Sequence, residues 1–460
     1  MIEVREIQQV ATDLGLQVQV VEKDYALGWL LAGIAQHPAI KDSWVFKGGT
    51  CLKKCYFETY RFSEDLDFTL KDSAHLDPAF LSKTFGEIGA WLYDQCGMQL
   101  PPNLFDFDVH PDPSKQYVLG KIGYIGPRQN PRGSIPKIKL DLTSKELLVM
   151  EPVLRDVYHP YSDAPADGIK ARCYAYEEVF AEKIRALAER LRPRDLYDVI
   201  HLHRHRAPDC DRASLLATLE KKCQFKGIAV PTFASLQGHP ERAALEVDWD
   251  QMLSHQLASL PTIQPFWSEL SGFFDWLLAG KAQRVLPPMP TAAAAGSEAW
   301  TPPRAGLAFG ISVPIERIRM AASNRVCVKL GYHGKERIVE PYSFRQSRDG
   351  NRLFIGFERD AAAIRSYSLS KIESVQVTNE PYSPRYPVEI NIEGPLRMPG
   401  ISRPRSTPPN PYGRPTYIVQ CNLCSHQFKR ESRSTNLRPH KDKAGYKCLG
   451  RVGFVIHTLY

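Results

Sequence analysis

The sequence predicts an α+β protein of several domains. Its 460 residues exceed the usual size of a single domain, and a hydrophobic content of 43% is enough to bury real cores. Segments with strand-like alternation and segments with helical spacing both occur, and two proline-rich stretches interrupt them. We therefore expect a first domain over 1–285, a linker over 286–310, a β-rich module over 311–383, a second linker over 384–415 and a terminal module over 416–460.

The most informative motif is a glycine turn, Lys47-Gly48-Gly49-Thr50, followed by the segment Arg61–Phe68 with its paired carboxylates. On an extended strand Asp65 and Asp67 share one face. Two such carboxylates repel each other unless a cation lies between them, and Mg²⁺ prefers hard oxygen ligands. The glycines let the backbone approach a phosphate, and Thr50 adds a hydroxyl. Separately these features are typical of an ordinary turn and a solvated strand; together they indicate a nucleotidyl-transfer site.

A third carboxylate lies in the segment Lys137–Thr143, where apolar residues alternate as in a half-buried strand. Asp141 falls on the opposite face. If this strand lies beside the strand of Asp65 and Asp67, the three acids converge as a two-metal site requires. The alternative is an exposed aspartate on an amphipathic strand.

The segment Tyr176–Leu187 has helical spacing, and Lys183 lies on or beside its apolar stripe. A lysine there is costly unless it snorkels to solvent or meets a negative partner, such as nucleotide phosphates. The next helix begins near Pro193. Asp195 is either its cap or, with Asp198 one turn later, part of a second acidic pair.

These motifs, with Glu22-Lys23-Asp24-Tyr25 before them, resemble the AbiEii/AbiGii toxin family over about the first 280 residues. The resemblance implies a nucleotidyltransferase domain of the polymerase-β type with a helical bundle. It also implies an enzyme that is a toxin of a toxin–antitoxin or phage-defence system, with a cognate antitoxin. Relatives in this family add nucleotides to tRNA 3′ ends, so an NTP and an RNA acceptor are the expected substrates.

The expected catalytic residues, which would hold two Mg²⁺ ions, are Asp65, Asp67 and Asp141. The residues expected at the nucleotide are Lys47, Gly48, Gly49, Thr50, Arg61, Ser63, Lys183, Asp195 and Asp198. Two other functions stay open. One is a nucleic-acid-sensing regulator with a secondary or inactive transferase, and the other is transfer of a nucleotide or phosphate to a protein hydroxyl.

The β-rich module is expected to contain a helix over 317–322 and strands over 325–330, 337–340, 353–357 and 374–378, with a hairpin turn at Asp349-Gly350. Its motifs resemble a WYL domain, an SH3-like barrel, although the Trp-Tyr-Leu triplet is absent. Such domains often sense nucleic-acid fragments or nucleotides. The candidate ligand residues are Tyr332, Arg359, Arg365 and Tyr367, and the alternative is a barrel that serves only as a spacer or a dimer contact.

The terminal segment is a candidate metal site. Cys421-x-x-Cys424 is followed by His440 and Cys448. A cysteine pair at this spacing fits one tetrahedral ion, and thiolate and imidazole ligands favour Zn²⁺. His426 is the rival third ligand. The pattern looks like a short zinc ribbon.

Positive charge is concentrated in the same segment. Residues 401–460 contain 11 Lys and Arg against 2 acids, which gives +9, whereas the whole chain carries +8. This localisation favours a nucleic-acid partner over a merely solubilising tail. The longest apolar run, Leu27–Ala35, is too short to span a bilayer and predicts a buried helix. With no signal-peptide pattern at the start and scattered cysteines, we expect a cytoplasmic protein without membrane contact.

Overall fold

The computed structural model describes residues 1–57, 61–129, 135–205, 210–257, 259–282, 286–290, 297–299, 315–347, 349–390, 416–430, 432, 434–442 and 447–459. The chain divides into two compact units, Met1–Leu396 and Arg397–Tyr460. Most of both expected linkers, including all of 391–415, lies outside the described residues. The four boundaries between the five expected segments therefore stay predictions.

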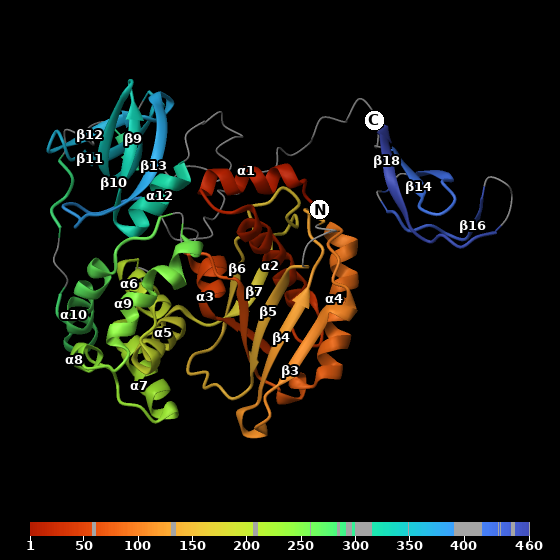
Figure 1. Cartoon of the computed structure of the whole chain (residues 1–460), viewed down its shortest axis with the longest axis horizontal. Helices are drawn as coiled ribbons and strands as arrows, with labels where there is room; N and C mark the ends of the chain where they lie inside the picture. Colours follow the sequence, from red (N-terminus) through yellow and green to blue (C-terminus); the bar gives the residue numbers. More distant parts are fainter. Residues whose placement is uncertain are drawn as a thin grey trace. The chain divides into compact units, whose positions relative to one another are not determined.

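A seven-stranded mixed sheet forms the centre of the first unit (Figure 1). Its spatial order is β3 (Phe105–Val109), β4 (Tyr117–Gly123), β5 (Lys137–Thr143), β2 (Asp65–Leu70), β1 (Trp44–Lys47), β7 (Lys170–Cys173) and β6 (Val153–Asp156). β2 pairs with β5 in parallel, and β1 pairs with β7 in parallel. The expected strand over Lys137–Thr143 is confirmed and lies directly beside β2.

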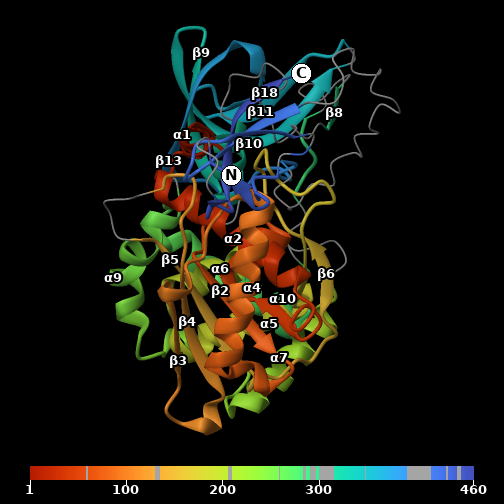
Figure 2. The ribbon, with the colours of Figure 1, turned by 90° about the vertical axis from the view of Figure 1, so that its right-hand side faces the viewer.

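Three helices lie beside this sheet (Figure 2): α1 (Val4–Leu14), α2 (Val18–Gln36) and α4 (Pro78–Cys96). The apolar run predicted as a buried helix lies in α2, which is buried over almost its whole length. Asp77 is the N-cap of α4, and its carboxylate accepts a hydrogen bond of 2.8 Å from the amide of Phe80. After β1 the chain turns at once into a short helix, α3 (Gly48–Cys51), and a π-helix over Leu52–Tyr56.

A helical bundle follows the sheet in sequence. It contains α5 (Tyr176–Arg190), α6 (Pro193–Arg204), α7 (Arg212–Lys226), α8 (Phe233–Gln237), α9 (Arg242–Leu253) and α10 (Ile263–Ala279). The predicted starts of α5 at Tyr176 and of α6 at Pro193 are confirmed. Apolar side chains of the sheet and of this bundle form one continuous core, so the bundle holds a fixed position beside the sheet.

The β module comprises α12 (Ile315–Asn324), β8 (Ser297–Ala299), β9 (Val326–Tyr332), β10 (Lys335–Ser347), β11 (Arg352–Glu358), β12 (Ala363–Ser368) and β13 (Ile372–Pro381). Its strand order is β12-β11-β10-β9-β13, with β8 paired to β10. The predicted helix, the four predicted strands and the turn at Gly350 are present. β12 was not predicted as a strand, and β8 falls within the expected first linker.

The β module contacts the bundle through polar groups. The Tyr197 hydroxyl on α6 donates a 2.7 Å hydrogen bond to Oδ1 of Asn324 on α12, and His205 Nε2 donates to the carbonyl of Ser323 at 2.9 Å. Figure 1 shows α12 at the base of the module's strands, on the side that faces the rest of the unit. The module is therefore an integral part of the first compact unit.

The terminal unit is small. β14 (Thr416–Cys421), β15 (Gln427–Arg430) and β18 (Gly453–Leu459) form a three-stranded sheet, and β16 (His440–Lys441) pairs with β17 (Lys447–Cys448). Its buried cluster consists of Val419, Cys421, Leu437 and Cys448. Within the described parts of the whole chain, no helix is long and apolar enough to cross a membrane.

Candidate active site

Two of the predicted acids are direct neighbours in the sheet. In the parallel pairing of β2 with β5, Asp67 lies opposite Asp141 and Asp65 lies opposite Lys139. The alternation that places Leu66 and Leu140 in the core turns these acids to the other face. The strand register therefore brings the carboxylates of Asp67 and Asp141 together, which the sequence analysis expected on the condition that the two strands were neighbours.

The glycine turn packs directly on this pair. β1 runs antiparallel to β2, with Lys47 opposite Asp67. Gly48 has a φ of +81°, and a Cβ atom there would lie 1.9 Å from Oδ2 of Asp67. Only glycine fits both this backbone conformation and this close approach. The turn thus presents backbone at the position where the carboxylates converge.

A cavity of about 700 Å³ opens at this point. Of the predicted residues, those that line it are Lys47, Gly48, Gly49, Asp67, Asp141 and Lys183. Its volume lies in the range of small-molecule sites. We call it the acidic cavity, after the adjacent carboxylates of Asp67 and Asp141 in its lining.

The electrostatics of the carboxylates favour a bound cation. Burial, and then the charge of Asp141, raises the pKa of Asp67 to about 7. Burial also raises the pKa of Asp141, against the opposing effects of Lys47 and of a 2.9 Å hydrogen bond from the Tyr117 hydroxyl. The charge of Asp65 contributes to both upward shifts. A divalent cation would relieve this repulsion, so the donor set fits Mg²⁺.

A nucleotidyltransferase family model accounts for this part of the chain. The family described as nucleotidyl transferase AbiEii toxin, type IV toxin–antitoxin system, matches residues 29–279, which is more than half of the sequence. The chain belongs to this family. It is accordingly a nucleotidyltransferase toxin of the type IV class, and membership implies a nucleotide substrate and a cognate antitoxin.

Two solved structures resemble the chain at low identity. MenT4, a nucleotidyltransferase toxin from Mycobacterium tuberculosis H37Rv, is 16% identical with a TM-score of 0.41, over 60% of this chain and 90% of that chain. Proteasome accessory factor B/C of Arthrobacter aurescens is 16% identical with a TM-score of 0.14, over 62% of this chain and 41% of that chain. No curated protein matches the sequence. The assignment therefore rests on the family model.

In this AbiEii-family chain, Lys183 has a negative partner inside the protein. Its Nζ lies 2.7 Å from Oδ2 of Asp198 on α6, and Arg61 binds the same carboxylate through Nε and Nη2 at 2.8 and 2.9 Å. Although burial alone would raise it, the charges of Arg61 and Lys183 hold the pKa of Asp198 well below its usual value. Lys183 thus reaches the acidic cavity from a fixed ion-pair network and does not simply snorkel to solvent.

Other predicted nucleotide residues lie behind the cavity wall. The buried Thr50 hydroxyl donates to the backbone oxygen of Asp65, so it ties the glycine turn to β2. Ser63 and Arg61 lie beside Gly49. A Cβ atom added to that glycine would lie 3.0 Å from Oγ of Ser63 and 3.0 Å from Nη2 of Arg61. None of these three side chains is among the described residues that line the acidic cavity. The structure therefore gives them a supporting position.

Asp195 is not a helix cap, because the N-cap of α6 is Arg192, which makes no side-chain capping bond. Its buried carboxylate instead accepts two hydrogen bonds from Arg190, at 2.7 and 2.8 Å. Arg190 lines the acidic cavity. Asp195 consequently holds the guanidinium group of Arg190 in place at the acidic cavity.

Several cavity residues were missed by the sequence reasoning. Lys115 and Lys145 flank strands β4 and β5, and Phe225 and Lys226 end α7. Lys145 donates to the carbonyl of Ser114 at 2.9 Å, and Lys226 lies 3.8 Å from Glu146. These residues belong to no recognisable sequence motif. Only the tertiary fold brings their loops and the end of α7 to the cavity, so the sequence alone did not indicate them.

The role of the four candidate WYL-ligand residues stays a prediction, and the structure shows the contacts that each of them makes. The rings of Tyr332 and Tyr367 meet edge to face with centroids 5.2 Å apart, and the hydroxyl of Tyr367 donates to Glu358. Arg359 binds Glu380 at 2.9 Å and Glu340 at 3.4 Å. Arg365 is exposed on β12. The two tyrosine rings are therefore in contact, and Arg365 lies two residues before Tyr367 on the same strand.

The predicted metal ligands of the terminal unit do converge. Ligand atoms of Cys421, Cys424, His440 and Cys448 all lie within 4.8 Å of one another. Sγ of Cys424 is 3.3 Å from Nε2 of His440, while Nδ1 of His440 donates to the carbonyl of Arg438 at 3.0 Å. That bond leaves Nε2 directed at the thiols, which is how second-shell contacts orient a ligating histidine. His426 is not part of the cluster.

Proposed function

We propose that this toxin transfers a nucleoside monophosphate from an NTP to the 3′ end of an RNA, with tRNA as the first candidate. The observation that carries the proposal is the adjacency of Asp67 and Asp141 in a cavity that also contains the glycine turn and Lys183. Carboxylates, a close-approach backbone and a fixed cation are the parts that phosphoryl chemistry needs.

Two Mg²⁺ ions would be held by Asp67 and Asp141, with Asp65 beside them. When bound, such ions stabilise the charge on the attacking and leaving oxygens. The chain's own groups orient the substrate. The backbone at Gly48 and Gly49 lies against the triphosphate, and Lys183 compensates its charge while Asp198 and Arg61 keep the ammonium in place. The acceptor hydroxyl attacks the α-phosphate and pyrophosphate leaves.

The terminal unit is proposed to be a zinc module that binds RNA. Besides the four converging ligands, amides of Leu423 and Gly450 donate to the sulfurs of Cys421 and Cys448 at 3.4 and 3.2 Å. Such bonds stabilise thiolates, the form that binds Zn²⁺. The +9 charge of residues 401–460 suits a polyanion.

The test is incubation of the purified protein with each α-labelled NTP, once with total RNA and once with a protein lysate. We expect label in RNA, at the 3′ end, only when Mg²⁺ is present. Label in protein alone would replace the RNA acceptor by a protein hydroxyl. An absence of label in both mixtures, with every NTP, would refute transfer and leave a regulator as the function.

A further inference from the structure

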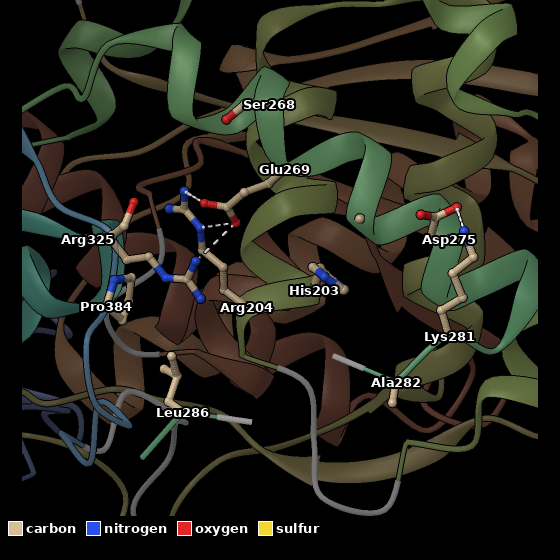
Figure 3. Close-up of a pocket in the computed structure, with 12 residues that line it drawn as sticks. His203, Arg204, Ser268, Glu269, Asp275, Lys281, Ala282, Leu286, Arg325 and Pro384 are labelled. Atoms are coloured by element: carbon tan, nitrogen blue, oxygen red, sulfur yellow. Dashed lines mark hydrogen bonds and ion pairs between the residues drawn. The ribbon is translucent and has the colours of Figure 1, made fainter. Parts of the chain in front are cut away.

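A second cavity, of about 560 Å³, lies between the bundle and the β module (Figure 3). Its walls come from His203 and Arg204 at the end of α6, from Glu269 and Gly272 on α10, and from Arg325 at the start of β9. It shares no lining residue with the acidic cavity. We call it the bundle–module pocket.

The charge of this pocket is unbalanced. Its lining holds three cationic side chains, Arg204, Arg325 and Lys281, against the two carboxylates of Glu269 and Asp275. Lys281 pairs with Asp275 at 3.1 Å. Both arginines therefore share Glu269, as the dashed lines of Figure 3 show. One carboxylate compensates two guanidinium groups, and a positive charge is left over.

The two arginines differ in how many of their donors are used. Arg204 binds Glu269 through Nε and Nη2 at 3.0 and 2.7 Å, and its Nη1 lies 3.4 Å from the Asn324 carbonyl. Its side chain is 2% exposed. Arg325 makes one hydrogen bond to a described residue, from Nη1 to Glu269 at 3.2 Å, and its side chain is 27% exposed. Arg325 thus has guanidinium donors available on the cavity side.

The local environment of Arg325 also favours a bound anion. Burial, and then the charge of Arg204, lowers the pKa of Arg325. Its backbone has a φ of +54°, in the left-handed region that non-glycine residues seldom adopt. Strain of this kind persists where the surrounding structure fixes it, and it concentrates at ligand sites. An additional anion would relieve the charge repulsion at this position.

We propose that the bundle–module pocket binds a small phosphorylated ligand, with the guanidinium of Arg325 as the phosphate contact. Arginine offers paired donors that match phosphate oxygens. The volume accommodates a mononucleotide as well as free phosphate. The same helix, α6, carries Arg204 at this pocket and the buried Asp198 that pairs with Lys183 of the acidic cavity, so the site is connected to the transferase by one element.

The chain offers a matched pair of substitutions for the test. Gly272 lies on α10 in the pocket lining, and a Cβ added there meets nothing within 4 Å. Gly272→Leu should fill the cavity without touching the ion pairs, whereas Gly272→Ala adds only a methyl group and serves as the control. Both replace a helical glycine, so neither should lower stability. Arg325→Gln removes the phosphate contact itself.

Calorimetric titration of the full chain with inorganic phosphate, AMP and adenosine measures the site directly. We expect saturable binding of phosphate or AMP but not of adenosine, retained in Gly272→Ala and weakened about tenfold or more in Gly272→Leu and Arg325→Gln. A preference between phosphate and AMP identifies the source of the phosphate group. Equal affinities in Gly272→Leu and Gly272→Ala, or no saturable binding to the wild-type protein, would overturn the proposal.

Discussion

At the scale of single residues, the acidic cavity depends on a glycine that has no space for a side chain. Gly48 adopts a φ of +81° and lies against the carboxylate of Asp67. A methyl group there would strain the backbone and displace Asp67 from its place opposite Asp141. A displacement of about 1 Å at a reacting centre can cost roughly 10²-fold in rate. The transfer rate should therefore be sensitive even to a methyl group at position 48.

We predict that Gly48→Ala lowers nucleotidyl transfer by about 10²-fold or more. The matched control is Gly168→Ala, since Gly168 has a φ of +72° but a Cβ there meets nothing within 4 Å. Both variants should lose about 1 kcal/mol of stability from backbone strain. Only Gly48→Ala should lose activity, as measured by steady-state transfer rates. Equal activity in the two variants would contradict the close contact with Asp67.

At the scale of elements, helix α6 carries Arg204 at the bundle–module pocket and Asp198 behind Lys183, and it buries two histidines in its last turn. Burial, and then the charge of Arg204, lowers the pKa of His201 to about 3. His205, just after α6, has a pKa shifted in the same direction, also mainly by burial. In the unfolded chain a histidine has a pKa near 6.5, so acid favours unfolding.

The sign of this linkage gives a pH prediction. Because the folded pKa of His201 is depressed, the unfolded state takes up the proton first, and stability falls as pH drops below about 6.5. At pH 5 His201 alone should cost about 2 kcal/mol relative to pH 7. His201→Phe should remove that part of the difference in urea unfolding, whereas substitution of exposed His255 serves as the control. An unchanged pH dependence in His201→Phe would refute the assignment.

The elements also show how far the sequence could predict the site. Alternation in the segments Asp65–Leu70 and Lys137–Thr143 predicted which face each acid occupies. That β2 and β5 are neighbours did not follow, because β3 and β4 intervene in sequence and only packing sets the strand order. The internal partner of Lys183 was missed for the same reason. Asp198 lies on the next helix, and a helical pattern does not reveal which helices touch.

At the scale of the whole molecule, the chain has two compact units with different means of stabilisation. The first has a large apolar core, whereas the described residues of the terminal unit contribute four buried side chains to its cluster. So small a core cannot offset chain entropy without a further constraint. Zinc bound by the converging cysteines and histidine would supply that constraint.

We predict that the purified chain contains about one equivalent of zinc and that chelation unfolds the terminal unit while the unfolding of the first unit is unchanged. Affinity for RNA should fall with chelation and with rising salt. Metal analysis of Cys421→Ser should show lost zinc, and Cys210→Ser, outside the cluster, is the control. Full zinc in Cys421→Ser, or none in the unchelated wild-type protein, would contradict the site.

The proposed transferase activity requires that Asp67 and Asp141 take part in nucleotidyl transfer. The direct measurement is the rate of transfer from labelled NTP to RNA by Asp67→Asn, Asp141→Asn and the double variant. Asp108→Asn, an exposed aspartate on β3 of the same sheet, is the control. Each site variant should remain folded and lose about 10²-fold or more of the rate, while the control keeps it. A folded Asp67→Asn/Asp141→Asn protein that transfers nucleotide at the wild-type rate would contradict the central claim.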